Sequence, residues 1–426
     1  MKLDQIWVRR AAVVAIAGAM AVAPLAGCQS NTTSTTSGSD SSASQASDST
    51  NGTIEVTIDD TSCKLTANTA KSGVVTFKVT NNGTAVNEFE ILAEDKLQIV
   101  TERENLTPGT TTEVTALLEP GTYYTASKTN MVGALVDATE FVVEDSGEAV
   151  AVSSDEQELR DNALTMYTAY IRDQAGQLVE ATNNFVEAYK SGDTAKAKEL
   201  YPLARMYYER VEPTAEAFGD IDPNLDLREA DAKAGDVEDM ADWKGWHAIE
   251  KDLWTPEDAN YTAEQKTALA DALVADTKAF YDLVYSNDFS IKIDDVTNGA
   301  ISLLEEVATS KITGEEEAFS HTDLYDFQAN VEGAKVAYGN VKSIVEKKDP
   351  DLAKEIDEAF DTLETYLSKY NTGTSEAPVY PSYTEIDSNA GAEQDEDNLS
   401  TGARELSDAV NALRSALGDL TAVVLS

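Results

Sequence analysis

Histidine and cysteine are nearly absent from this 426-residue chain, which contains two of each. A site built from several imidazoles or from a cluster of thiolates is therefore excluded by number alone. Basic residues are also scarce, since 32 Lys and Arg stand against 77 Asp and Glu and the formal net charge is −45. A surface with this charge repels phosphate backbones and attracts cations, so nucleic acid is not an expected partner.

Long apolar runs are lacking outside the N-terminus. Three basic residues among the first ten precede a run of small apolar residues at 11–25, which is too short to span a bilayer comfortably and is typical of an export signal. The sequence Leu-Ala-Gly before Cys28 resembles the lipobox of bacterial lipoproteins. We expect residues 1–27 to be a signal peptide and Cys28 to carry a lipid. The alternative is an ordinary secretory signal with an incidental cysteine.

Residues 28–52 consist mostly of Ser, Thr, Asp, Asn and Gly. Such a segment cannot bury a core and is expected to be a disordered tether. We therefore expect an exported protein, held by its lipid on the outer face of the cytoplasmic membrane, at the cell surface or in the periplasm. Cys63 would be the only other thiol, so no intramolecular disulfide is expected.

Apolar and polar residues alternate in the segment from residue 53 to about 145. The alternation is clearest at residues 53–59, 74–80, 88–92 and 139–143. Short strands at this spacing, separated by Asn-Gly and Pro-Gly turns, predict a small β-sandwich of a size that suits a cupredoxin-like fold. A type 1 copper centre needs two His and a Cys, and this segment contains no His, so that centre is excluded.

A helical period follows a polar linker at residues 145–155. Helices are predicted at about 156–189, 194–218, 245–254, 262–285, 292–308, 322–347, 350–370 and 400–422. Residues 371–398 are expected to form a long surface loop. We therefore predict a multidomain α and β chain, in which residues 155–426 form an all-α antiparallel helical bundle.

His247 and Glu250 lie on the apolar face of the predicted helix at 245–254. On a helical wheel Glu250 falls between Trp246 and Trp254, where an unpaired carboxylate would be costly. Residues three apart meet on one helix face, so His247 can help to satisfy it. A cation shared by the two side chains and a His–Glu hydrogen bond that only stabilises the bundle are both consistent with the pattern.

The other candidate carboxylates carry less information by themselves. Glu209 and Glu212 share one helix face, which a solvated acidic surface would equally explain. Asp226 lies in an acidic loop that lacks the EF-hand pattern. His321 and Asp323 lie at a predicted helix start, where a capping cluster is an alternative to a functional role.

Several segments together resemble the EfeO family of extracytoplasmic iron-uptake proteins. They are residues 88–92, 102–105, 208–213, 245–251 and 314–333. Members of this family place a cupredoxin-like domain before an imelysin-like domain that is labelled a peptidase. The resemblance covers nearly all of residues 53–426, with residues 53–145 as the first domain and residues 155–426 as the second.

The resemblance implies a metal site at the family's His-x-x-Glu motif. Its residues here would be His247 and Glu250 with Glu209, Glu212 and Asp226. His321 and Asp323 would support the ligands without binding the metal. One imidazole among carboxylates suits iron, as Fe2+ or Fe3+, and would also accept zinc, copper or manganese.

A second metal site in the β segment is a weaker implication. Relatives can pair the position of Cys63 with another cysteine after a Pro-Gly turn, and this chain has none there. A site would have to use Glu88, Glu90, Glu102 and Glu104, with or without Cys63. Alternate residues on a strand share a face, which fits both glutamate pairs, although exposed strand charges are the alternative.

The resemblance implies an iron-binding lipoprotein that delivers iron to a membrane iron permease, beside a haem-dependent peroxidase. We do not expect an enzyme. A zinc metallopeptidase needs His-Glu-x-x-His or His-x-x-Glu-His, and Lys251 stands where the second motif needs a histidine. A polysaccharide-binding surface lipoprotein is a third candidate, because Trp243, Trp246 and Trp254 could stack on sugars, although their helical spacing is typical of a core.

Overall fold

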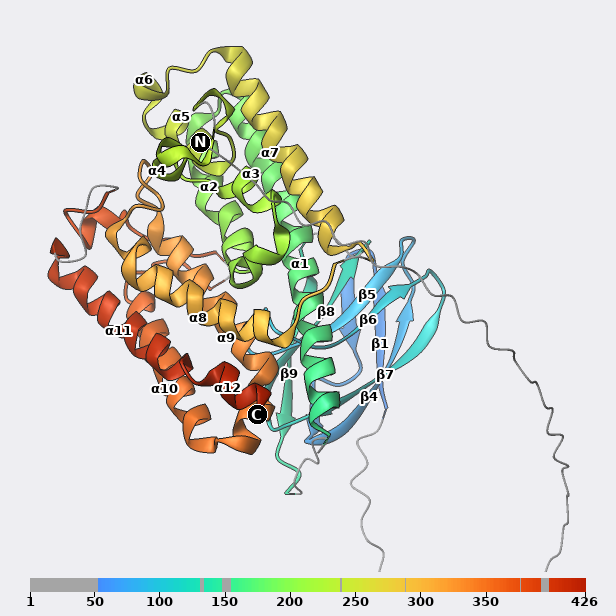
Figure 1. Ribbon diagram of the computed structural model, residues 1–426. Helices are drawn as coiled ribbons and strands as arrows, with labels where there is room; N and C mark the ends of the chain where they lie inside the picture. The colour runs from blue at the N-terminus through green and yellow to red at the C-terminus, as the bar shows by residue number, and fades with distance from the viewer. Residues whose placement is uncertain are drawn as a thin grey trace, which may run out of the picture. The chain divides into compact units, whose positions relative to one another are not determined.

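The computed structural model describes residues 53–130, 134–147, 155–237, 240–287, 289–375, 377–391 and 398–426. The predicted signal peptide, tether and Cys28 lie outside these residues and stay predictions. The described residues all belong to one compact unit. Its first part consists of strands and the rest of helices (Figure 1), as the sequence predicts.

The strands form a β-sandwich of two sheets. Their orders are β2-β1-β4-β7 and β3-β9-β8-β5-β6. Strands pair antiparallel except β1 with β4 and β3 with β9. The strands are β1 (Ile54–Asp59), β2 (Ser62–Leu65), β3 (Thr69–Lys71), β4 (Gly73–Asn81), β5 (Asn87–Leu92), β6 (Ile99–Leu106), β7 (Thr111–Leu118), β8 (Gly121–Thr129) and β9 (Val136–Glu144).

Strand alternation decides which side chains of β5 fill the sandwich. Phe89 and Ile91 point into the core between the sheets, which Cys63 of β2 shares. Glu88 and Glu90 alternate with them and therefore lie on the opposite face of their sheet. Helix α1 packs on that face, where its Ala169 contacts apolar side chains of β5, β6 and β8.

The rest of the unit is helical. The helices are α1 (Glu156–Ser191), α2 (Thr194–Glu209), α3 (Ile221–Asp226), α4 (Glu229–Asp231), α5 (Trp246–Trp254), α6 (Pro256–Ala259), α7 (Ala263–Val284), α8 (Ile293–Thr309), α9 (Asp323–Lys348), α10 (Pro350–Ser368), α11 (Thr401–Leu417) and α12 (Leu420–Leu425). Short 3-10 helices lie at Glu212–Phe218, Met240–Asp242, Lys311–Thr313 and Tyr383–Glu385, and a π-helical turn at Ala232–Asp236.

One predicted helix is broken in a way that matters for the site. The sequence predicts a helix over roughly 194–218 with an end or kink at Pro213, and in the structure α2 ends at Glu209 and a 3-10 helix begins at Glu212. Pro213 explains the break, because it has no N–H to donate and its ring clashes with the carbonyl of the residue four positions earlier. The chain therefore turns between Glu209 and Glu212.

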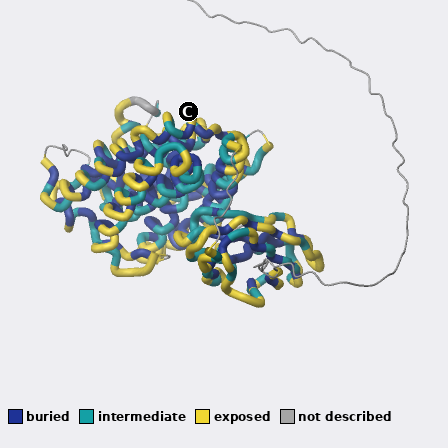
Figure 2. The backbone as a smooth tube through the Cα atoms, turned by 90° about the horizontal axis from the view of Figure 1, so that it is seen from below, coloured by how far each residue is buried: buried dark blue, intermediate teal, exposed yellow. Residues whose placement is uncertain are grey.

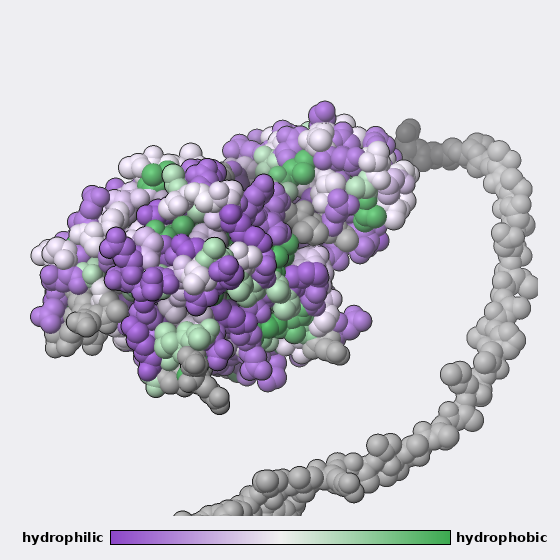
Figure 3. All heavy atoms as spheres, turned by 90° about the horizontal axis from the view of Figure 1, so that it is seen from above, coloured by the Kyte–Doolittle hydropathy of each residue, from purple (hydrophilic) through white to green (hydrophobic). Residues whose placement is uncertain are grey.

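Helix α9 lies at the centre of the helical region. It packs against α1, α2, α8 and α10, while α1 also packs against α2 and α7, and α11 against α8 and α10. Buried segments line the inner sides of the helices (Figure 2), and Tyr167, Tyr201 and Trp246 are fully buried. The face shown in Figure 3 is mostly hydrophilic with small apolar patches. Within the described part of the chain, the helices are too short or too polar to cross a membrane.

Candidate metal centre

A glycine brings His247 next to Asp226. Gly245 directly precedes α5 and has a φ of 91°, and a Cβ there would lie 2.2 Å from the carbonyl oxygen of Leu225. Glycine tolerates both the left-handed backbone and the close contact. The start of α5 therefore packs against the end of α3, where Asp226 is the last residue.

The two ring nitrogens of His247 face different partners. Nδ1 lies 3.2 Å from Oε2 of Glu250. Nε2 lies 3.4 Å from Oδ1 of Asp226 and 3.6 Å from Oε1 of Glu316, and it has no hydrogen-bond partner among the described residues. A histidine whose Nδ1 donates to a carboxylate presents Nε2 as a metal ligand. The hydrogen bond between His247 and Glu250 and a bound cation, which the sequence leaves as alternatives, can therefore occur together.

Glu250 is already engaged on both oxygens. Besides the contact of Oε2 with His247, its Oε1 accepts the backbone N–H groups of Phe319, at 2.9 Å, and Ser320, at 2.7 Å. Glu250 is fully buried, so these bonds satisfy a carboxylate that would otherwise be costly. The arrangement suits a residue that orients the imidazole and fixes the segment carrying Glu316.

Glu209 and Glu212 lie in a neighbouring group around Lys311. The Nζ atom of Lys311 lies 3.1 Å from Glu209 Oε2 and 2.8 Å from Glu212 Oε2, and Asn330 Nδ2 donates to both carboxylates. A Cβ on Gly333 would lie 2.2 Å from the carbonyl oxygen of Arg210, so glycine allows the close approach of α9 to the end of α2. The five residues predicted for the site are thus brought into two adjacent groups.

Four further residues of this cluster are not among those predicted from the sequence. They are Arg205, Lys311, Glu316 and Glu317. Arg205 and Lys311 gave no signal, because basic side chains on helices are seldom buried. Glu316 and Glu317 lie within the segment 314–333 that carried the family resemblance, so that segment was the signal that could have found them. Ligand atoms within 4.8 Å of one another come from Asp226, His247 and Glu316, and also from His247, Glu250 and Glu317.

The carboxylates nearest Nε2 are held in their ionised form. Burial alone would raise the pKa of Asp226, but the charges of Arg205 and His247 outweigh it and hold that pKa well below its usual range. Burial likewise opposes the ionisation of Glu316, whose pKa Lys311 and His247 lower well below normal. Asp226 and Glu316 can therefore accept a cation.

Proton occupancy differs elsewhere in the cluster. Burial raises the pKa of Glu212 well above its usual value, despite the nearby charge of Lys311. Burial and Arg205 disfavour the imidazolium of His247, but the neighbouring carboxylates, Asp226 first, outweigh them and raise its pKa. A metal that binds Nε2 must therefore displace a proton, as is usual for histidine ligands.

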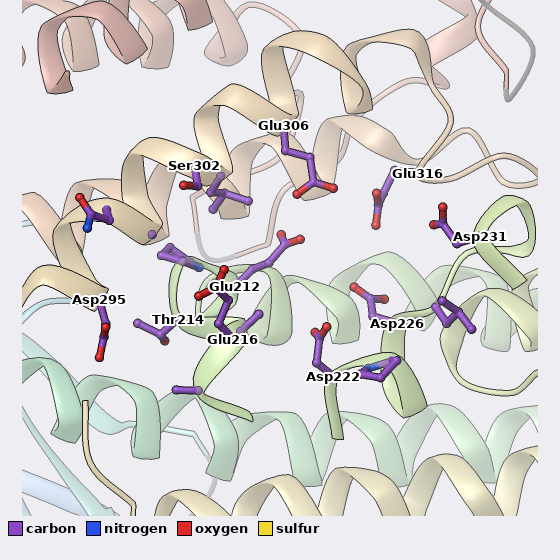
Figure 4. A pocket seen from close by; sticks show the side chains of 18 of the residues that line it. Glu212, Thr214, Glu216, Asp222, Asp226, Asp231, Asp295, Ser302, Glu306 and Glu316 are labelled. Atoms are coloured by element: carbon purple, nitrogen blue, oxygen red, sulfur yellow. The ribbon is translucent and has the colours of Figure 1, made fainter. Parts of the chain in front are cut away.

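An acidic cavity of about 660 Å³ gives access to the cluster. Asp226, Glu212 and Glu316 line it, and the labelled carboxylates face one another across it from the segment 212–231, from α8 and from the segment carrying Glu316 (Figure 4). The further carboxylates of its wall are Glu216, Asp222, Asp231, Asp295 and Glu306. Such a lining favours the entry of cations.

His321 and Asp323 lie beside Glu317. The Oδ1 atom of the buried Asp323 accepts the backbone N–H of Glu317 at 3.3 Å. The backbone N–H of His321 donates to the carbonyl oxygen of Glu317 at 2.8 Å. Neither side chain belongs to the groups of close ligand atoms found among the described residues.

The carboxylates of the proposed second site gather around a lysine. Nζ of the buried Lys128 lies 3.3 Å from Glu90 Oε1 and 3.7 Å from Glu88 Oε1, and it contacts Asp173 of α1. Glu102 lies directly across from Glu90 on β6. An ammonium therefore stands where a metal would have to bind.

Glu104 and Cys63 have different surroundings from Glu88 and Glu90. Glu104 lies on β6 two residues after Glu102, partly exposed. The structure does not bring Cys63 to these carboxylates, because its side chain lies in the sandwich core, whereas Glu88 and Glu90 lie on the other face of their sheet. Burial also raises the pKa of Cys63 to about 12, so it does not offer a thiolate.

The chain matches two family models, Imelysin over residues 163–417 and Cupredoxin-like domain over residues 33–136. Similar proteins include the iron uptake system component EfeO of Escherichia coli O157:H7, of E. coli K12 and of Shigella flexneri. Each is 36% identical over 341 residues, which cover 79% of this chain and 86% of the relative. This chain belongs to the EfeO family.

Membership of the EfeO family confirms the predicted fold class. The β-sandwich lies largely within the cupredoxin-like match, and the helical region corresponds to the imelysin match. All residues around His247 fall within the imelysin match, and the cluster around Lys128 is contributed mostly by the cupredoxin-like one.

Proposed function

We propose that this protein is the iron-binding component of an iron uptake system, and that it binds iron through His247 Nε2, Asp226 and Glu316. One observation carries the proposal: a buried imidazole nitrogen without a hydrogen-bond partner in the described structure faces two ionised carboxylates. One imidazole with carboxylates is a hard, anionic ligand set that suits iron as Fe2+ or Fe3+. Zinc, manganese and copper would also bind such a set.

Capture begins at the acidic cavity in this proposal. The net charge of −45 raises the local concentration of cations, and the carboxylates of the cavity wall lead to Asp226 and Glu316. Glu250 keeps the imidazole oriented, since both of its oxygens are engaged. The iron is cargo here, so the site must bind it and also release it.

The partners and location follow from the family and from the N-terminal sequence. We propose that Cys28 carries a lipid that holds the protein on the outer face of the cytoplasmic membrane. The iron would pass to a membrane iron permease, in a system that includes a haem-dependent peroxidase. Relatives are named as components of an iron uptake system, which supports this assignment.

Peptidase activity is a less suitable function for this cluster. Zinc peptidases hold their metal with two histidines of one motif and use a glutamate as the base. His247 is the only imidazole in the groups of close ligand atoms found among the described residues. Glu250 is occupied by two backbone N–H groups, so it is not free to activate water.

Sugar binding through the tryptophans is also less suitable. Trp246 is fully buried and Trp243 is 4% exposed. Stacking on a sugar ring requires an accessible face of the indole. These two side chains instead pack in the apolar interior.

The test is anaerobic titration of the purified chain with ferrous iron, repeated with zinc. We expect one tight site, and we expect His247→Ala, Asp226→Asn and Glu316→Gln each to weaken it at least 100-fold. Glu90→Gln is the control, because Glu90 belongs to the cluster around Lys128. Binding that survives all three substitutions, or that falls only in the control, would refute the site.

A further inference from the structure

Arg205 places a permanent positive charge inside the proposed metal site. It lies on α2 and is fully buried. Its guanidinium contacts five carboxylates, those of Glu209, Asp226, Glu316, Glu317 and Asp326. Arginine keeps its proton in proteins, so this charge is present with or without a bound metal.

The guanidinium uses the same oxygen atoms as the proposed metal site. Arg205 Nη1 contacts Asp226 Oδ1, and Nη2 lies 3.3 Å from Glu316 Oε1. These oxygens are the ones that face His247 Nε2 at 3.4 and 3.6 Å. A metal at about 2 Å from each ligand atom would lie beside the guanidinium, and the two positive charges would repel each other. The metal and Arg205 therefore compete for Asp226 and Glu316.

A second set of acceptors lies on the other side of the guanidinium. Nε of Arg205 is 2.7 Å from Glu317 Oε1 and 3.6 Å from Asp326 Oδ1. Asp326 is 1% exposed, and within the described structure neither of its carboxylate oxygens has a hydrogen-bond partner. A buried acceptor without a donor is costly. An Arg205 side chain that leaves Asp226 and Glu316 would satisfy Asp326.

We propose that Arg205 is an exchangeable counter-ion for the metal, an inference that rests on the proposed metal site. In the metal-free protein the guanidinium neutralises Asp226 and Glu316. When a metal binds, the guanidinium withdraws onto Asp326 and Glu317, and it returns when the metal leaves. The cluster keeps a compensating cation in both states. The metal must displace a charge to bind, which limits its affinity and favours the release that a carrier needs.

The experiment compares zinc and anaerobic ferrous iron binding in three variants and the wild type. Arg205→Gln removes the competing charge, so we expect at least a tenfold higher affinity and a slower dissociation of the metal. Asp326→Asn replaces one acceptor oxygen with an amide NH2 group that cannot receive the guanidinium, so we expect the affinity to fall about tenfold. Arg210→Gln is the matched control, because Arg210 is a buried arginine that follows α2 and pairs with Glu332 at 2.7 Å. We expect its affinity to stay within twofold of wild type.

The sign of the Arg205→Gln effect separates competition from a structural role. A merely structural arginine would lower the affinity when it is removed, and that result would overturn the inference. If Arg205→Gln does not fold, Asp326→Asn decides, and an unchanged affinity there would overturn the inference. If His247→Ala does not change the metal binding of the wild type, the proposed metal site is refuted. The proposal that Arg205 exchanges with the metal is then refuted as well.

Discussion

Two buried carboxylate clusters of this molecule contain basic side chains, but only one of them contains an imidazole. In the helical region, His247 Nε2 stays without a hydrogen-bond partner among the described residues, beside Asp226 and Glu316. In the β-sandwich, the ammonium of Lys128 stands between Glu88 and Glu90, where an added cation would have to bind. The first cluster offers a ligand nitrogen in addition to its carboxylates and basic side chains, whereas the second offers only carboxylates around an ammonium.

The comparison shows that acidity alone does not define a metal site. Both clusters hold several carboxylates that burial makes costly to ionise. The helical cluster differs in two respects. It contains an imidazole nitrogen that can lose its proton and bind a metal, and it contains two carboxylates with a lowered pKa, Asp226 and Glu316. In the sandwich the pKa of Glu102 is raised to about 7, first by burial and then by the charge of Glu90.

The largest expected effect comes from removing the cation of the sandwich cluster. Lys128→Met leaves Glu88, Glu90 and Asp173 without their ammonium, and breaking a buried ion pair costs about 3–5 kcal/mol of unfolding free energy. Urea denaturation measures the loss. We also expect added zinc to bind at this cluster in the variant and to stabilise it. In the wild type the ammonium of Lys128 should keep zinc out of the cluster.

The control for Lys128 is Lys78→Met. Lys78 pairs with Glu55 at 3.1 Å on the surface of the same sandwich, with 43% of its side chain exposed. Exposed ion pairs contribute about 0–1 kcal/mol, so the control should change little. Equal effects of the two substitutions would show that Lys128 is not the counter-ion of the cluster.

Periodicity alone predicts much of this fold. The alternation at residues 88–92 corresponds to β5, and the helical pattern at 245–254 corresponds to α5 within one residue. The helical wheel also places His247 and Glu250 on one face, and they form a hydrogen bond. These are local properties of the chain, which depend on residues a few positions apart.

The basic residues of both clusters could not be predicted in the same way. Arg205, Lys311 and Lys128 are fully or almost fully buried, although isolated basic residues are usually exposed. Their partners come from distant segments, so no local period signals the contact. Cys63 belongs to the predicted second site only through the family resemblance, and strand alternation alone does not reveal which face of which sheet its side chain occupies.

The next largest effect tests how the helical cluster is assembled. Gly245→Ala puts a Cβ 2.2 Å from the carbonyl oxygen of Leu225 at a residue with a φ of 91°. We expect a loss of about 2–3 kcal/mol and a metal affinity about tenfold lower, because α3 must move away from α5. Thermal unfolding and zinc titration measure the two effects.

Gly109→Ala in the sandwich is the control for Gly245. Its φ of 78° imposes a similar backbone cost, but nothing lies within 4 Å of the added Cβ. We expect about 1 kcal/mol and unchanged metal binding. If both substitutions affect the affinity equally, the contact between α3 and α5 does not position His247.

A smaller effect distinguishes an orienting carboxylate from a ligand. Glu250→Gln keeps the shape of the side chain but removes the charge that faces His247 Nδ1. Loss of such a partner lowers metal affinity about 10–100-fold, or about 1.4–2.8 kcal/mol. Zinc titration of Glu250→Gln measures this loss of affinity. Asp323→Asn is the control, and its zinc affinity should stay within about threefold of wild type. A loss as complete as that of His247→Ala would make Glu250 a ligand.

The smallest effect concerns the pH dependence of the sandwich cluster. Burial, together with neighbouring Glu90, raises the pKa of Glu88 from 4.5 to about 10. The folded chain therefore keeps a proton that the unfolded chain loses above pH 4.5, and stability falls as the pH rises between these values. Glu88→Gln cannot ionise, so its advantage over wild type should grow from pH 5 to pH 6 by roughly 1 kcal/mol.

Urea denaturation at the two pH values measures this advantage, with Glu144→Gln as the control. A hydrogen bond from Lys71 lowers the pKa of Glu144. The stability that Glu144 contributes is therefore complete at pH values above its ordinary pKa and is lost only in acid. The difference between Glu144→Gln and wild type should therefore be constant over the same range. A constant difference for Glu88→Gln as well would mean that Glu88 is ionised in the folded protein. The sandwich cluster would then be short of positive charge, as the helical cluster is, and its carboxylates would have to be reconsidered as metal ligands.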